Sequence, residues 1–105
     1  MDNFRVIYKI LKRLEAAMDF LEFDGDTVSE NALGISTERR TALLSMMLKI
    51  GYIEGIIVKK YADGEEVILR EENMKITLKG LEYLHDNSMM KKAARIAKGI
   101  AETIK

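Results

Sequence analysis

The residues from Ser36 to Leu84 constrain the fold of this chain more than any other part of it. They begin with a helical pattern over residues 37–50, which Gly51 ends. Two segments rich in β-branched and aromatic residues follow, and the turn signal Asp63-Gly64 between them predicts an antiparallel hairpin. A second helical pattern then opens at residues 76–81, which read Ile-Thr-Leu-Lys-Gly-Leu.

Two further helices are predicted before this stretch. Apolar residues at steps of three and four predict a helix over residues 3–21, and they are Phe4, Ile7, Leu11, Leu14, Met18 and Leu21. A turn then leads to a very short strand ending at Val28. Ser29 is the expected cap of a short helix over residues 30–33, which Gly34 ends.

The resulting order of elements is helix, helix, helix, strand, strand, helix, which is the order of a winged helix-turn-helix domain of the α+β class. Residues 1–87 are predicted to form this domain, and residues 88–105 a C-terminal helical extension after an interruption at Asn87-Ser88. The Asp63-Gly64 turn should lie at an exposed hairpin tip. The predicted core includes Leu14, Leu43, Met47, Leu81 and Leu84.

The composition indicates a soluble domain without the basic excess typical of nucleic-acid binding. The 105 residues carry 17 basic and 17 acidic side chains, so the net charge is zero. There is no cysteine, which excludes disulfides and thiolate ligands. No apolar run approaches the ~18 residues of a membrane span, and the first residues lack a basic secretory signal. We therefore expect a cytoplasmic protein with no membrane partner.

Nothing in the sequence favours an enzyme. His85 is the only histidine, so it has no second imidazole or thiol with which to share a metal ion. Its neighbours in the sequence do not complete a catalytic triad. No phosphate-binding glycine loop and no zinc-protease motif occurs. We expect no catalytic residue, no metal site and no cofactor.

Charge is unevenly distributed, and the third predicted helix lies in a basic region. Residues 36–60 carry five basic and two acidic side chains, a net charge of +3. In a winged helix this helix enters the major groove of DNA. If its core side is centred on Leu43, Met47 and Ile50, its opposite face carries Glu38, Thr41, Ala42, Ser45 and Lys49. Arg39 and Arg40 flank the core side in the first turn, from which long side chains can reach a phosphate.

The hairpin predicted for residues 52–61 and 66–70 adds two bases, Lys59 and Lys60. They can grip backbone phosphate beside the groove, although the acidic tip repels it. The alternative is that these charges only protect an edge strand against pairing. The predicted contacts to double-stranded DNA are Arg39, Arg40, Thr41, Ser45, Lys49, Lys59 and Lys60.

Residues 91–105 form a basic amphipathic pattern in which Ile96, Ile100 and Ile104 recur every fourth residue. This stripe is too apolar to be left in water, and isolated helices of under ~12–15 residues are only marginally stable. We expect it to pack against the helix over residues 3–21, within one chain or across the two-fold axis of a homodimer, and we prefer the dimer. A membrane-surface helix is less well supported, because the stripe lacks Trp and Phe.

Residues 1–11, 32–36 and 51–55, together with the segment Ile-Thr-Leu-Lys-Gly-Leu-Glu-Tyr-Leu at 76–84, resemble the YjcQ-like family. These are small winged-helix proteins of Gram-positive bacteria and their prophages. The resemblance covers nearly the whole chain. It implies a winged-helix fold, a phage-associated origin and a DNA-binding role, and it carries no catalytic motif.

The function that we expect is that of a phage-derived DNA-binding protein, acting as a transcriptional regulator through phosphate anchoring. The alternative is a winged helix that serves as a protein-protein interaction module and binds no DNA. The nearly neutral face of the third helix favours the interaction module. The +3 region and the usual role of the fold favour DNA.

Overall fold

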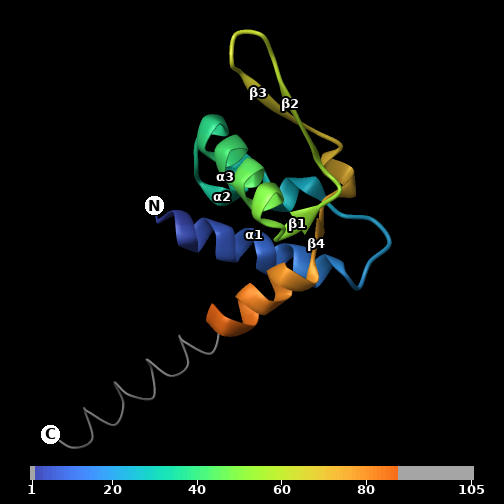
Figure 1. The fold of residues 1–105 in the computed structure, drawn as a ribbon. Coiled ribbons are helices and arrows are strands. Elements are labelled where there is room, and N and C mark those ends of the chain that lie inside the picture. Colours follow the sequence, from blue (N-terminus) through green and yellow to red (C-terminus); the bar gives the residue numbers. More distant parts are fainter. Residues whose placement is uncertain (1, 88–105) are drawn as a thin grey trace, which may run out of the picture.

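Short local signals set the boundaries of the elements in the computed structural model, which describes residues 2–87 (Figure 1). The elements are α1 Asn3–Ala17, η1 Gly25–Val28, α2 Glu30–Leu33, α3 Thr37–Ile50, β1 Ile53–Glu54, β2 Ile57–Lys60, β3 Glu66–Leu69, η2 Glu71–Asn73 and β4 Lys75–Ile76. Here η denotes a short 3₁₀ helix. Residues 78–87 form a further helix.

Helix α1 begins at a side-chain cap and ends four residues before the predicted boundary. The carboxylate of Asp2 accepts a hydrogen bond from the Phe4 backbone N–H at 2.9 Å. The helix ends at Ala17, whereas the apolar periodicity predicts residue 21. The last residues of the stripe, Met18 and Leu21, are exposed and have no core to pack against. Helices of this kind depend on packing of their apolar face, so the periodicity alone does not extend α1.

Serine caps and left-handed glycines fix α2 and α3 where the sequence predicts them. The hydroxyl of Ser29 accepts from the Ala32 N–H at 3.2 Å, and that of Ser36 accepts from the Arg39 N–H at 3.1 Å. Gly34 and Gly51 end the two helices with positive φ angles. These ends are local in origin, which is why they are predictable.

The predicted short strand at Val28 is wrong. Residues Gly25–Val28 form the 3₁₀ helix η1, because Asp24 curls the backbone at this point. Its carboxylate accepts from the Asp26 N–H at 3.0 Å, and its carbonyl accepts from the Thr27 N–H at 3.2 Å. A side chain that bonds its own backbone two residues on competes with an extended conformation.

The region predicted as one strand over residues 52–61 is two strands in two sheets. Strand β2 pairs with β3 in the hairpin, whereas β1 pairs with β4, which the sequence analysis missed. The break falls near Gly55, whose φ is +94°. A Cβ atom at this position would lie 1.8 Å from the carbonyl oxygen of Asn73, so only glycine fits.

The base of the hairpin is closed where the two ends of residues 52–76 meet. The antiparallel register places Ile53 opposite Ile76. Beside this pair, the backbone N–H of Thr77 donates to the carbonyl of Tyr52 at 3.1 Å, and its hydroxyl donates to the carbonyl of Gly51. The same hydroxyl accepts from the Gly80 N–H, which confirms Thr77 as the cap of the following helix.

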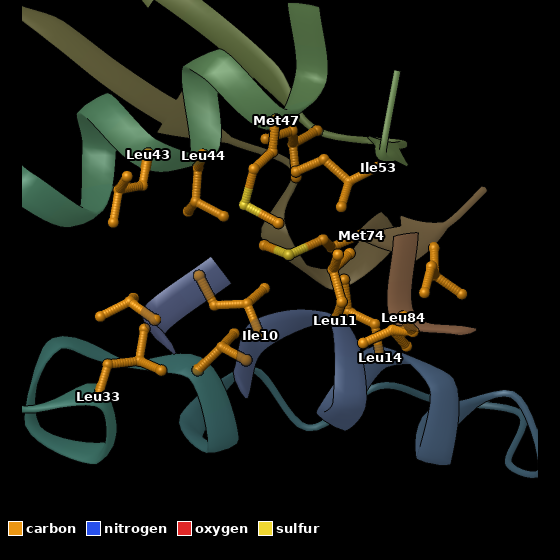
Figure 2. Packing of buried hydrophobic residues seen from close by; sticks show 14 residues of the cluster. Ile10, Leu11, Leu14, Leu33, Leu43, Leu44, Met47, Ile53, Met74 and Leu84 are labelled. Atoms are coloured by element: carbon orange, nitrogen blue, oxygen red, sulfur yellow. The ribbon is translucent and has the colours of Figure 1, made fainter. Parts of the chain in front are cut away.

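The hydrophobic core lies between α1 and α3 and is closed by β1, β4 and the helix over residues 78–87 (Figure 2). In Figure 2, the side chains of Met47 and Met74 point toward one another at its centre. The predicted core residues Leu14, Leu43, Met47 and Leu84 are buried, but Leu81 is only partly so. The fully buried or nearly fully buried members also include Val6, Ile10, Leu11, Val28, Leu33, Leu44, Ile53, Ile56, Met74 and Ile76.

The described residues confirm the α+β class, and their arrangement is the one expected of a winged helix. Figure 1 shows α1, α2 and α3 gathered on one side and the hairpin of β2 and β3 projecting from them. The Asp63-Gly64 turn lies exposed at the tip of this hairpin, as predicted. The predicted extension with Ile96, Ile100 and Ile104 lies outside the described residues.

Candidate nucleic-acid interface

Helix α3 presents a different face to solvent from the one that its sequence predicts. The prediction centres the core side on Leu43, Met47 and Ile50, yet Ile50 is 49% exposed and Leu44 is completely buried. Apart from Thr37 at the first position, the exposed residues of α3 share one side of the helix, and they are Glu38, Arg39, Ala42, Met46, Lys49 and Ile50. The helix is therefore rotated about its axis relative to the prediction. The reason is that α1, β1 and β3 all pack against it.

The guanidinium of Arg40 is used inside the protein. The residue is 7% exposed, and its Nε donates to the carbonyl of Val28 at 2.7 Å. Its Nη2 lies 2.5 Å from Oε1 of Glu71, so the pair ties α3 to η1 and η2. The pKa of Glu30 lies below its usual range, chiefly because of a hydrogen bond with its own backbone, with a smaller contribution from the Arg40 charge. Arg40 consequently has no access to phosphate in this structure.

Three of the predicted contact residues meet in a shallow hollow between α3 and the hairpin. Ser45 and Lys49 come from α3 and Lys60 from β2, and the hollow has a volume of about 250 Å³. Ser45 forms its inner wall and is only 5% exposed, whereas both lysines are exposed. Glu66 also lines the hollow and lies directly opposite Lys60 in the hairpin register. The local charge is therefore positive but partly compensated.

Lys59 lies on the other face of the hairpin, because successive strand residues point in opposite directions. Its amine is 5.2 Å from the centre of the Tyr61 ring, at the distance of a cation–π contact. The tip beyond it is acidic, and the Asp63 carboxylate accepts from the Glu65 N–H at 2.9 Å. The side chains of Lys59 and Lys60 thus lie on opposite faces of the hairpin.

The remaining predicted residues lie at the edges of this surface. Arg39 is exposed in the first turn of α3, and Thr41 is half-buried on the side of the helix away from it. The structure thus brings together Ser45, Lys49 and Lys60, and leaves Arg40 apart from them.

Two large apolar side chains, Met46 and Ile50, lie on the solvent face, where the sequence pattern does not predict them. Apolar residues occur around the whole of α3, so their periodicity does not single out one buried side. No local signal marks the correct rotation, and the burial of Arg40 shows why. Its placement needs knowledge of Val28 and Glu71, which are distant in the sequence.

Other kinds of site find little support in residues 2–87. This part of the chain contains no group of three His, Asp or Glu side chains that could hold a metal ion. None of its helices combines the length and the apolar character needed to cross a membrane. The pKa of Tyr83 is raised, mainly by burial, which reflects its packing 4.9 Å from the ring of Tyr52.

Comparison with known proteins agrees with the resemblance seen in the sequence. A family profile described as "YjcQ protein" matches residues 8–103, which is nearly the entire chain. The match extends through the C-terminal segment as well as the helices and hairpin. Comparisons with curated proteins and with solved structures give no match. On the strength of the profile match, this chain belongs to the YjcQ family.

Proposed function

We propose that this protein binds double-stranded DNA with the exposed side of α3 and the adjoining hairpin. The observation that carries the proposal is the hollow where Lys49 and Lys60 lie exposed on two neighbouring elements. A helix seated in the major groove would direct Lys49 and Arg39 toward the backbone, while the hairpin places Lys60 beside the groove. Lys59 extends the basic surface to the far side of the hairpin.

The charges set the strength that we expect of this binding. Arg39, Lys49, Lys59 and Lys60 can each neutralise a phosphate, but Glu38 and Glu66 lie among them. Three or four such contacts give a slope of about −3 in log K against log salt concentration. Binding to arbitrary duplex should therefore be weak and strongly salt-dependent.

Base readout by this surface would rely on apolar contact. Ala42 and Met46 occupy the middle of the exposed side of α3, and small apolar groups can contact the thymine methyl in the major groove. A role as a transcriptional regulator of phage origin rests on the family resemblance alone.

The test is a titration of labelled duplex at low salt, about 50 mM. The double variant Lys49→Ala with Lys60→Ala should lose at least about tenfold in affinity and about two units of the salt slope, since two phosphate contacts disappear. The matched control, Arg5→Ala with Lys12→Ala, removes the same net charge from the exposed side of α1. Equal losses of affinity in both variants would mean that only the net charge matters, and they would contradict the proposed surface.

A protein-interaction module is the second candidate, and the exposure of Met46 and Ile50 favours it. These side chains are 58% and 49% exposed, and they place apolar area where a DNA reader usually carries polar groups. Absence of duplex binding at tens of micromolar protein at low salt would favour this function over DNA binding.

A further inference from the structure

A second hollow, remote from the hairpin, lies at the C-terminal end of α1. It has a volume of about 410 Å³, and its floor includes Met74 and Ile76. Its walls include three side chains that are largely in solvent: Met18, Phe20 and Leu21, the last of them fully exposed. Exposed apolar groups clustered at a hollow mark a contact surface more often than isolated ones do. We call this the α1-end hollow.

The segment beside the α1-end hollow is acidic, whereas the hollow itself is lined by one acid, Glu72, and one base, Lys75. Residues 18–26 carry four carboxylates, on Asp19, Glu22, Asp24 and Asp26, and no basic side chain. All four of these residues are exposed. Glu22 and Asp24 also line an adjoining hollow that shares Phe20 and Phe23 with the first. An apolar hollow beside an acidic segment is a suitable binding surface for a basic amphipathic helix.

The chain itself contains a segment of that kind. Residues 88–105 carry five basic side chains and one acidic one. Within them Ile96, Ile100 and Ile104 recur at the spacing of one helix face. The bases Lys91, Lys92, Arg95 and Lys98 lie beside and opposite this stripe. The apolar pattern therefore complements the α1-end hollow, and the basic character of the segment complements the acidic residues 18–26 beside it.

The length of the chain allows the segment to return to the hollow. The helix over residues 78–87 starts two residues after Ile76, which lines the hollow, and at 1.5 Å per residue it carries the chain about 15 Å away. A helix over residues 91–105 would be about 22 Å long, enough to run back past Ile76. A short tether of this kind gives an effective concentration in the millimolar range, far above that of a second copy at micromolar protein.

We propose that residues 91–105 fold back on their own chain and seat Ile96, Ile100 and Ile104 in the α1-end hollow, beside the acidic residues 18–26. This commits the isoleucine stripe to the same chain and not to a homodimer. It leaves the hollow between α3 and the hairpin uncovered, since no residue of α3, β2 or β3 lines the α1-end hollow.

The absence of cysteine makes disulfide trapping a direct test in the full chain. The double variant Leu21→Cys with Ile100→Cys should form an intrachain disulfide with oxidised glutathione, because the two positions face each other. The control, Leu21→Cys with Lys98→Cys, moves the second thiol to the opposite side of the stripe. It should react at least about tenfold more slowly, since thiols more than ~7 Å apart between Cα atoms cannot bridge without backbone movement.

Non-reducing electrophoresis at micromolar protein separates the outcomes. A cross-linked monomer formed preferentially by the Ile100 variant supports the proposal. A cross-linked dimer would overturn it in favour of docking on a second copy. Equal rates for the two variants would overturn docking altogether.

A second measurement needs no cross-link. Backbone amides of residues 91–105 in the full chain should be protected from hydrogen exchange, and Ile100→Gln should remove at least about tenfold of that protection. Lys98→Gln, the matched polar substitution off the stripe, should leave most of it. Unprotected amides in the unsubstituted chain would overturn the proposal.

Discussion

The ion pair of Arg40 and Glu71 joins a buried side chain to a partly exposed one. The Arg40 side chain is 8% exposed, whereas that of Glu71 is 42% exposed. Removing one partner should therefore cost a different free energy from removing the other. A buried guanidinium without a carboxylate is left uncompensated, whereas the Glu71 side chain is partly exposed, with its paired oxygen, Oε1, buried.

This asymmetry predicts unequal effects on stability. Glu71→Ala should lower the free energy of unfolding by about 3 kcal/mol, because it strands the buried Arg40 charge. Arg40→Met keeps most of the side-chain volume and should lower it by about 1–2 kcal/mol, mainly through the lost bond to Val28. Urea unfolding at pH 7 measures both. A larger effect of Arg40→Met would contradict the assignment of the buried partner.

Among the elements, the hairpin depends on one close approach of backbone to backbone. Gly55 lies against the carbonyl of Asn73, where the hairpin leaves the small sheet of β1 and β4. Gly64 at the tip has a similar positive φ, +89° compared with +94°, but no atom lies within 4 Å of where its Cβ would be. The two glycines share a similar positive φ and differ in the space available for a Cβ.

Alanine substitutions at these positions separate the two effects. Gly64→Ala should lower the free energy of unfolding by about 1–2 kcal/mol, the strain of a left-handed alanine. Gly55→Ala should lower it by at least about 2 kcal/mol more, because the backbone at Asn73 has to move. Thermal unfolding of the two variants, measured in parallel, gives the comparison. Equal shifts in melting temperature would mean that the backbone at Asn73 can move at no free-energy cost, which would contradict this prediction.

For the molecule as a whole, the rotation of α3 decides which side chains form the core and which form the surface. Leu44 is fully buried, although the sequence pattern does not single it out as a core residue. Ile50 is half exposed, although the sequence places it in the core. This exchange also moves Ser45 from the expected DNA-reading face to the wall beneath the hairpin.

The rotation is testable with two conservative truncations in the same helix. Leu44→Ala should lower the free energy of unfolding by about 2–5 kcal/mol, a large part of the ~5–15 kcal/mol expected of a domain. Ile50→Ala should lower it by about 0.5–1 kcal/mol, because half of its surface is already in water. Chemical denaturation checks both values. The reverse order would restore the orientation predicted from the sequence.

The features that could be predicted from the sequence are those that depend on interactions between residues close together in the chain. Ser29 and Ser36 cap helices, Gly51 ends one, and Asp63-Gly64 turns the hairpin through bonds to near neighbours. Strand β4 has only two residues and pairs with β1 across the whole hairpin, so no local pattern marks it. Likewise, the burial of Arg40 depends on Val28 and Glu71, which are distant in the sequence. The sequence could therefore not predict that Arg40 is absent from the candidate site.

The closed base of the hairpin has a consequence for how this chain can vary. Thr77, Gly51 and Tyr52 join the strand ends, and β2 pairs with β3 above them, so the tip over residues 61–65 behaves as an insert held by its own stem. Lengthening such an insert at its tip adds only about 0.6 kcal/mol of closure entropy per doubling. Residues around Gly64 are thus open to insertion and exchange while the stem stays the same.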